Sequence, residues 1–285
     1  MLWGYFKKIV IADSIAIYVD QVYGNLTDYR GFALVIATLF FAFQIYCDFS
    51  GYTDIARGAA MLFGIDLMQN FKSPYLSETV KDFWGRWHIS LSTWFRDYVY
   101  IPLGGNRVGK FRHSLNLLLT FLISGFWHGA NYTFILWGGV HGAAQIAENG
   151  LRIKQGKKGI LKYVRIFIVF LFVTLSWVLF RAESIGDSLY VYSNMLYGVL
   201  KPLNYLQLGL GSLGISVKHL LFCLAFYFAP LFTLDIVGKR IGDDGLAAVE
   251  KWRKPLRWVF YGLLGLVVVF FSQKGIAAEF VYFQF

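Results

Sequence analysis

The sequence predicts an all-α, polytopic integral membrane protein with re-entrant or interfacial helices. Hydrophobic residues make up 57% of the 285 residues and aromatic residues 19%, and the mean hydropathy is +0.52. A soluble domain rarely has this composition. A membrane-spanning helix needs about 20 mostly apolar residues. The apolar stretches that meet or approach this length are residues 32–47, 115–126, 133–146, 163–180, 219–237 and 258–271.

The opening stretch, residues 1–23, reads as a helix with charges set into it. Its apolar positions are interrupted by Lys7, Lys8, Asp13 and Asp20. A secretory signal peptide instead carries an unbroken apolar core. We therefore expect an interfacial or internal helix here, and no cleavable signal peptide.

Residues 48–113 are too polar to cross a membrane and too aromatic for an ordinary solvated loop. They begin with Asp48 and Asp54, which stand beside small and hydroxylated residues. Such carboxylates are candidates for acid–base chemistry. A structural role is the favoured interpretation, in which backbone N–H groups and arginine side chains pair with them and hold an irregular segment together.

A helix is predicted over residues 81–98, with Ser77 or Thr79 as its N-cap. Apolar side chains recur in it at three- and four-residue spacing and form one stripe: Phe83, Trp84, Trp87, Leu91, Trp94, Phe95 and Tyr98. The charged residues fall on the other side, which suits a helix in the membrane interface. His88 lies at the edge of the stripe, so we expect its imidazole to face packed protein or a cavity.

The formal net charge is +10, and the basic residues gather in short loops between the apolar stretches. These loops are residues 106–113, 152–165 and 239–257. Because loops rich in Lys and Arg stay on the cytoplasmic side, we expect residues 182–217 and the C-terminal tail on the outside. The sequence has no basic stripe with interleaved stacking aromatics, so we expect no nucleic-acid partner.

GFWHGAN, residues 125–131, places an ionisable imidazole between two apolar stretches. The path of the chain makes this motif either the far turn of a hairpin or a break within the membrane. Gly125, Gly129 and Asn131 around His128 permit close backbone approach and a loosened helix. An ionisable residue inside a membrane is a functional candidate by default. From the residues alone, a role in catalysis or ion conduction and a packing role are equally open.

The other histidines and both cysteines have structural interpretations. His113 and His219 each begin an apolar stretch and are expected at the membrane interface. His141, in WGGVHG, is expected to hydrogen-bond a neighbouring helix. Cys47 and Cys223 lack metal-ligand spacing and are expected to be small buried hydrophobes. Because the sequence has no HExxH motif and no tight His/Asp cluster, no metal site is expected.

Three motifs carry a resemblance to a known family. In chain order they are YCDFSGYTDIARGAAMLFGIDLMQNFKSPY, FWGRWHISLSTWFRDYVYIPLGGNR and GFWHGANYTFILWGGVHG. Together they resemble the bacterial branch of the membrane-bound O-acyltransferase family, and YIPLGGNR with the closing FVYFQF is similar to its alginate O-acetyltransferase type. The resemblance runs from Leu2 to Phe285. It implies a single membrane-bound O-acyltransferase domain over residues 1–285, the C-terminal part of the family pattern, without the N-terminal helices that relatives carry.

The resemblance also implies the site and the reaction. The family's catalytic histidine, in its WHG motif, matches His128, and its second active-site position, in the RWH motif, matches His88. Gly85 stands where relatives usually carry a second arginine. The implied activity moves an acetyl group from a cytoplasmic donor to hydroxyls of an extracytoplasmic polysaccharide. Acetyl-coenzyme A is the expected donor, as a co-substrate and not as a bound cofactor. His128 would act as general base, and His88 would orient it or stabilise charge.

The same resemblance implies the location and the partners. We expect a multi-pass protein of the bacterial inner or plasma membrane, in contact with lipid, acyl donor and polysaccharide acceptor. A secreted esterase-like or acetyltransferase-like protein is the expected partner on the acceptor side. Two alternatives stay open. One is D-alanyl transfer to teichoic acid, within the same family, although YIPLGGNR favours polysaccharide acetylation. The other is a transporter or channel, which would also place histidine in a broken intramembrane segment.

Overall fold

The computed structural model describes residues 1–153, 155–156, 158–241 and 245–273. Within these residues every regular element is a helix, which confirms the predicted all-α class. Two residues of the second basic loop, Lys154 and Lys157, and the closing FVYFQF lie outside the described residues.

The chain forms two compact units. The first unit combines Met1–Met68 with Leu189–Phe285, and the second unit is Gln69–Ser188. One helix, α9 (Ile185–Asn194), runs across the boundary between them. The expectation of one functional domain stays a prediction.

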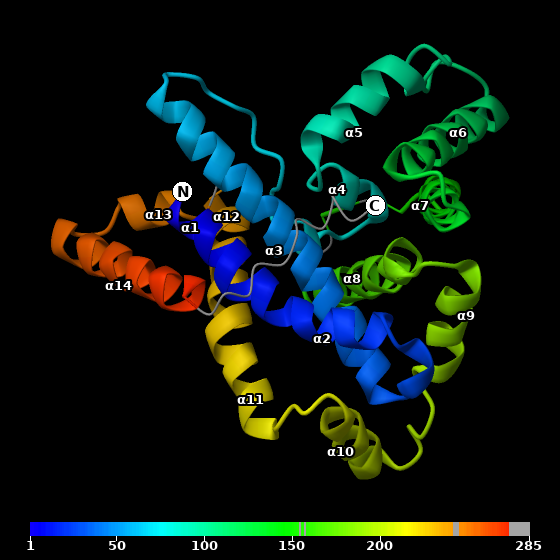
Figure 1. Cartoon of the computed structure of the whole chain (residues 1–285). Coiled ribbons are helices and arrows are strands. Elements are labelled where there is room, and N and C mark those ends of the chain that lie inside the picture. The colour runs from blue at the N-terminus through cyan, green and yellow to red at the C-terminus, as the bar shows by residue number, and fades with distance from the viewer. Residues whose placement is uncertain (154, 157, 242–244, 274–285) are drawn as a thin grey trace. The chain divides into compact units, whose positions relative to one another are not determined.

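The first unit opens with a helical run that packs along a long helix. The run consists of α1 (Leu2–Tyr5), the π-helical segment η1 (Phe6–Ala12) and α2 (Asp13–Tyr23), and the short turn η2 (Leu26–Asp28) then leads into α3 (Phe32–Leu62). Figure 1 shows α1 and α2 in dark blue beside α3. The opening stretch is thus the internal helix that its charged positions predict.

Two glycines make the closest approach between α1 and α3. A Cβ on Gly4 would lie 2.6 Å from the Gly51 carbonyl oxygen, and a Cβ on Gly51 would lie 2.7 Å from the Gly4 carbonyl oxygen. Real Cβ atoms do not come this near to a carbonyl oxygen, so neither position accepts a larger residue unless the helices move apart. Small residues allow the same close crossing in other membrane helix pairs.

Charges on the opening run pair with carboxylates on α3. Lys7 Nζ lies 2.7 Å from Asp54 Oδ2, and Lys8 Nζ lies 2.7 Å from Asp48 Oδ1 and 2.9 Å from Asp13 Oδ1. The expected irregular segment from Asp48 onward, with arginine partners, is therefore wrong. The α3 helix continues to Leu62 because lysines from the opening run neutralise its carboxylates and spare it the penalty of unpaired buried charge.

The residues that the structure describes in the rest of the first unit form further helices. Its elements are α10 (Pro202–Ser212), α11 (Val217–Phe222), the π-helical segment η5 (Cys223–Phe228), α12 (Ala229–Ile241), α13 (Ala247–Glu250) and α14 (Lys254–Ser272). Tyr46 on α3 donates a hydrogen bond to Asp235 Oδ1 on α12 at 2.9 Å. Cys47 and Cys223 are free thiols and fully buried, which confirms their interpretation as small hydrophobes.

The second unit packs its helices around tryptophan side chains. Its elements are η3 (Pro74–Leu76), α4 (Val80–Trp84), α5 (Ile89–Phe95), the π-helical segment η4 (Arg96–Tyr100), α6 (Lys110–His128), α7 (Tyr132–Gly150) and α8 (Ile160–Arg181). Trp87, Trp137 and Trp177 are at most 1% exposed. The Trp177 ring centroid lies 5.1 Å from that of Trp87 and 5.6 Å from that of Trp137. This aromatic core supports the elements that carry His88 and His128.

Four helices of the described residues are long and apolar enough to cross a membrane. They are α3, α8, the continuous stretch Val217–Ile241 and α14. The 31 residues of α3 extend about 46 Å at 1.5 Å per residue, which exceeds the roughly 30 Å hydrocarbon thickness of a bilayer. The remaining predicted spans, 115–126 and 133–146, fall in α6 and α7, which are not among the four helices.

Candidate active site

The GFWHGAN motif is the turn of an antiparallel hairpin formed by α6 and α7. The first helix ends at His128, and the second begins at Tyr132. A Cβ on Gly125 would collide with the Phe134 carbonyl, so this glycine lets the two helices touch. The motif is thus a turn between two helices, and its position relative to the membrane stays a prediction.

Asn131 fixes this turn to its surroundings. Its Oδ1 accepts a hydrogen bond from the Thr133 backbone N–H at 3.1 Å, and its Nδ2 donates to the Glu183 carbonyl at 2.7 Å. The first contact is an N-cap, which satisfies a backbone donor that α7 itself leaves free. The second contact ties the turn to the segment that follows α8. The backbone beside His128 is therefore held from both directions.

Aromatic rings surround the His128 imidazole. The centroid of this ring lies 5.0 Å from that of Trp127, 5.4 Å from that of Trp137 and 5.2 Å from that of Phe180, each in an edge-to-face arrangement. The side chain is half-buried, and it occupies the last position of α6. An imidazole among apolar rings is favoured in its neutral form, which is the form that can accept a proton.

The predicted helix over residues 81–98 is broken at the RWH motif. Its first part, α4, ends at Trp84, and α5 begins at Ile89. His88 itself has φ 45° and ψ 55°, the left-handed region that non-glycine residues seldom adopt. The expectation of one continuous helix is thus wrong, because a repeat of apolar side chains does not report the backbone angles of a single residue.

His88 is half-buried, in agreement with the expectation that it faces packed protein or a cavity. Burial lowers the pKa of its imidazole to about 4, so this group is neutral at physiological pH. A positive charge on His88 would lower the pKa of His128 further, in addition to the effect of burial. The second unit contains both of the histidines that the sequence singled out.

His141 plays a different part, on the same hairpin. Its ring is fully buried. Trp84 Nε1 donates to His141 Nδ1 at 3.2 Å, His141 Nε2 lies 2.9 Å from Ser176 Oγ, and Ser176 Oγ donates to the Val173 carbonyl at 2.7 Å. Because an indole N–H can only donate, His141 must carry its proton on Nε2 and donate to Ser176. The expected hydrogen bond to a neighbouring helix is confirmed.

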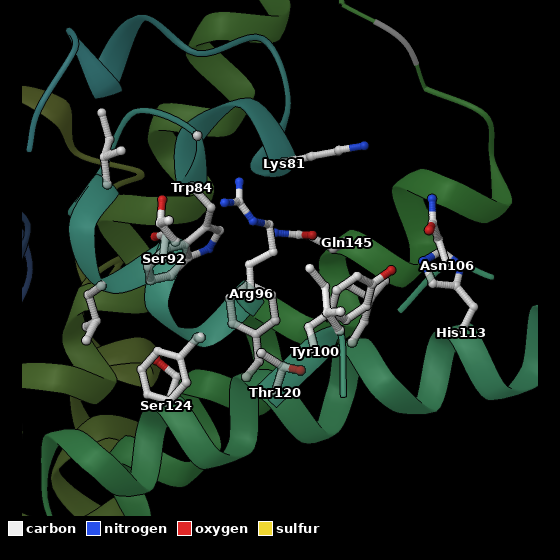
Figure 2. A pocket seen from close by; sticks show the side chains of 18 of the residues that line it. Lys81, Trp84, Ser92, Arg96, Tyr100, Asn106, His113, Thr120, Ser124 and Gln145 are labelled. Atoms are coloured by element: carbon white, nitrogen blue, oxygen red, sulfur yellow. The ribbon is translucent and has the colours of Figure 1, made fainter. Parts of the chain in front are cut away.

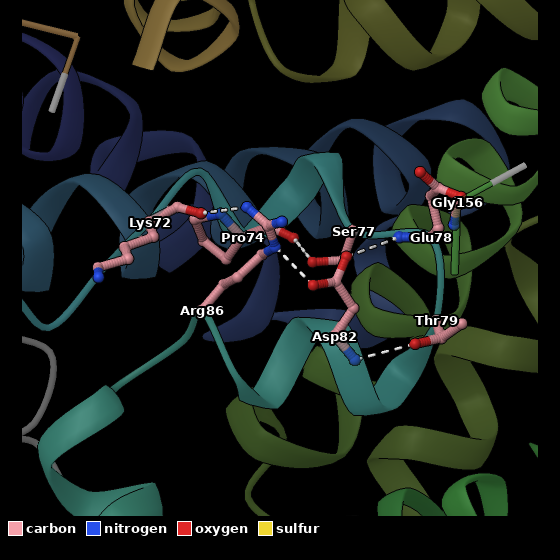
Figure 3. Close-up of polar contacts among 8 residues, drawn as sticks. All are labelled: Lys72, Pro74, Ser77, Glu78, Thr79, Asp82, Arg86 and Gly156. Atoms are coloured by element: carbon pink, nitrogen blue, oxygen red, sulfur yellow. Dashed lines mark hydrogen bonds and ion pairs between the residues drawn. The ribbon is translucent and has the colours of Figure 1, made fainter. Parts of the chain in front are cut away.

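Backbone caps position α4, which carries Trp84. Thr79 Oγ1 accepts from the Asp82 N–H at 2.9 Å, a contact drawn in Figure 3. Glu148 on α7 supplies two further acceptors, Oε1 for the Val80 N–H at 2.7 Å and Oε2 for the Lys81 N–H at 3.1 Å. Of the two predicted N-caps, Thr79 and not Ser77 is thus the residue that caps this helix.

A cavity of about 660 Å³ lies in the second unit. Figure 2 shows polar and cationic side chains around it, including Lys81, Arg96, Tyr100, Asn106, His113 and Gln145. Ser92 and Ser124 also line it, one helical turn along α5 and α6 from His88 and His128 respectively. Neither of the two histidines is among the lining residues. The size falls in the range of small-molecule sites.

The remaining predicted residues lie elsewhere. His113 lines the cavity, and its ring centroid lies 6.2 Å from that of Tyr100. His219, in the first unit, is 3.1 Å from the Tyr18 hydroxyl. Across the residues that the structure describes, no group of three or more His, Cys, Asp or Glu side chains is arranged to hold a metal ion.

The sequence analysis missed two residues that contact the site. Trp84 reads as one member of an apolar stripe, yet its indole N–H fixes the tautomer of His141. Asn70 carries no signal in the sequence, yet it binds the backbone beside His88. Both contacts join segments far apart in sequence, which periodicity and spacing do not report.

The fold and the site define a helical membrane protein that holds two interacting imidazoles at a break and a turn of its chain. A family model described as MBOAT, membrane-bound O-acyltransferase family, matches residues 1–179, a range that contains both histidines. The chain belongs to the membrane-bound O-acyltransferase family.

Curated relatives agree with this assignment. The chain is 37% identical over 292 residues to a probable alginate O-acetylase, AlgI, of Pseudomonas putida, an alignment that covers 99% of this chain and 59% of the relative. It is 43% identical over 195 residues to the peptidoglycan O-acetyltransferase of Helicobacter pylori, covering 68% of this chain and 37% of the relative. A teichoic acid D-alanyltransferase of Bacillus subtilis is 30% identical over 164 residues, covering 51% of this chain and 39% of the relative.

Proposed function

We propose that the protein transfers acetyl groups to hydroxyls of an extracytoplasmic polysaccharide, with His128 as general base and His88 assisting. The observation that carries this proposal is the placement of two histidines in one compact unit, one at the hairpin turn and one at the broken helix. The similarity to relatives named for O-acetyl transfer supports the choice of acyl group and acceptor. The similarity to D-alanyltransferases covers about half of the chain and makes D-alanyl transfer the second candidate.

The reaction requires one proton acceptor and stabilisation of one developing charge. His128 takes the proton from the acceptor hydroxyl as its oxygen attacks the thioester carbonyl. The C–O ester bond forms, the C–S bond breaks, and the proton passes from His128 to the departing thiolate. His88, neutral because of its burial, orients the base or donates a hydrogen bond to the oxyanion of the tetrahedral intermediate.

The cavity supports the entry of the acyl donor. Lys81 and Arg96 in its wall provide positive charge for the phosphates of a donor such as acetyl-coenzyme A. Ser92 and Ser124 line the cavity. Ser92 lies one helical turn from His88, and Ser124 lies one helical turn from His128. We propose that the donor binds here from the cytoplasmic side, consistent with the neighbouring basic loop at residues 106–113.

The acceptor arrives from the opposite side in this proposal. Because the acyl group alone would cross the membrane, neither donor nor polymer has to cross whole. We propose a location in the bacterial inner or plasma membrane and a secreted esterase-like or acetyltransferase-like partner that presents the polysaccharide.

Inverted membrane vesicles from the native organism test this function. We expect radiolabelled acetyl groups of acetyl-coenzyme A, added on the exposed cytoplasmic face, to appear as base-labile esters on the polymer. Vesicles from a strain deleted for the gene are the control. Transfer of D-alanine from a separately supplied, labelled D-alanyl thioester, without acetyl transfer, would favour the second candidate, and ion flux without acyl transfer would favour a channel.

A further inference from the structure

The backbone at His88 has an unusual conformation that neighbouring residues must hold. His88 is one of three non-glycine residues with positive φ among the described residues, and a left-handed conformation is disfavoured for a residue with a Cβ. Such residues persist where the surrounding structure fixes them, and they occur frequently at functional sites. The contacts on each side of His88 therefore determine where its imidazole points.

Asn70 holds the C-terminal side of His88. Its carbonyl oxygen accepts the Ile89 N–H at 3.0 Å, and its side-chain Oδ1 accepts the Ser90 N–H at 2.9 Å. These are the first two backbone donors of α5, which have no acceptor within the helix. The Ser90 hydroxyl in turn lies 3.4 Å from His88 Nδ1, so Asn70 also places a group that faces the imidazole.

Lys72 holds the N-terminal side of His88. Its N–H donates to the Arg86 carbonyl at 3.0 Å, and Arg86 Nη1 donates back to the Lys72 carbonyl at 3.1 Å. Arg86 is itself fixed by Asp82, whose Oδ1 lies 2.6 Å from Arg86 Nε. Figure 3 shows Arg86 between Lys72 and Asp82.

The two sets of contacts come from one short segment, residues 70–72, which runs beside residues 86–90. The Phe71 ring between them packs edge-to-face on Trp87, with centroids 5.0 Å apart. Because the carbonyl contact of Asn70 and the contacts of Lys72 use backbone atoms, most substitutions leave them in place. The Asn70 Oδ1 contact uses a side chain of this segment, so it is the hydrogen bond that a substitution within residues 70–72 can remove.

We propose that Asn70 is a positioning residue for His88. It acts by fixing the start of α5, which sets the direction of the His88 imidazole. This inference rests on the proposed function for its effect on catalysis. Its effect on the His88 turn itself does not depend on that function.

The test uses chromosomal variants, so that the protein is made with every segment and partner it natively has. Asn70→Ala removes the Oδ1 acceptor, Asn70→Asp retains it, and Asn70→Gln displaces it by one methylene. Ser216→Ala is the matched control, because Ser216 caps α11 in the first unit by the same kind of contact, with its side chain accepting from the His219 N–H at 3.1 Å. The amount of each variant in the membrane is measured first. Asn70→Gln replaces Asn70→Ala if the latter does not accumulate.

The first readout is independent of acyl transfer. Membranes are treated with diethyl pyrocarbonate, and carbethoxylation of His88 is followed by mass spectrometry. Loss of an N-cap contact changes a local equilibrium by about fivefold, so we expect His88 to react about fivefold faster in Asn70→Ala. The rate should stay at the native level in Asn70→Asp and in Ser216→Ala. An unchanged rate in Asn70→Ala and Asn70→Gln would overturn the inference.

The second readout is acetyl transfer. We expect Asn70→Ala to lower kcat several-fold, with the KM for the donor unchanged, and to have no further effect in a His88→Ala background. A full additional loss in that background would mean that Asn70 does not act through His88, and would overturn the inference. If even His128→Ala leaves transfer intact, the proposed function fails, while the carbethoxylation rates still decide the role of Asn70.

Discussion

His128 and His141 stand on the same hairpin but occupy different surroundings. His141 is fully buried, and each of its ring nitrogens has a hydrogen-bond partner whose role is fixed, Trp84 on one side and Ser176 on the other. His128 is half-buried at the turn, among ring edges, and interacts with a second imidazole. Protonation of His141 would cost the hydrogen bond that its Nδ1 accepts from Trp84. This contrast separates a structural histidine from a candidate base.

Removing the imidazole at the turn should have the largest effect on activity. We expect His128→Ala to lower acetyl transfer by about 10²- to 10⁴-fold, the usual contribution of a general base. Protein abundance in the membrane should stay near normal, because the His128 ring is half-buried and the variant loses only its edge-to-face contacts. Acetyl content of the polymer, divided by membrane abundance, is the measurement. His219→Ala, in the first unit, is the control and should keep its activity.

Removing the imidazole in the middle of α7 should affect stability. We expect His141→Ala to destabilise the protein by about 2 to 5 kcal/mol, because it opens a cavity and leaves the indole N–H of Trp84 without an acceptor. The detergent-solubilised variant should therefore melt at a lower Tm. Less of it should also accumulate in the membrane. Near-native Tm for this variant would contradict the structural role of His141.

The smallest expected effect is on the pH dependence of stability, through the buried imidazole of His88. Burial lowers the pKa of His88 to about 4, against about 6.5 for an unfolded histidine. The unfolded chain thus binds more protons between these values, so stability contributed by a neutral His88 is present above about pH 6.5 and is lost as pH falls toward 4.

We expect the Tm of the native protein to fall more steeply over this acidic window than that of His88→Gln, and the two slopes to agree from about pH 7 to 8. Detergent-solubilised protein melted across the pH range provides the measurement. Equal slopes at acidic pH would show that His88 is not buried as a neutral base.

Much of the fold is readable from the sequence because hydropathy and spacing are local properties. The four candidate spans each contain a predicted apolar stretch, and the turn at His128 follows from its flanking glycines. Thr79 is readable as a cap for the same reason, since a cap and its helix are neighbours in the chain.

The rest depends on contacts between distant segments. The α3 helix continues through Asp48 because Lys8, far away in sequence, neutralises the Asp48 carboxylate. The break at His88 is set by Asn70 and Lys72, and no periodic pattern marks them. The placement of His88 and His128 in the same compact unit depends on the folding of that unit, although each histidine is conspicuous by its motif.

The most direct test of the account replaces each hairpin histidine by glutamine. A glutamine side chain can donate and accept hydrogen bonds but cannot take up a proton near neutral pH. We predict that His141→Gln keeps acetyl transfer per membrane-embedded molecule within a few-fold of native, whereas His128→Gln loses about 10²- to 10⁴-fold. Near-native transfer by His128→Gln would contradict the assignment of His128 as the base and make GFWHGAN a packing motif.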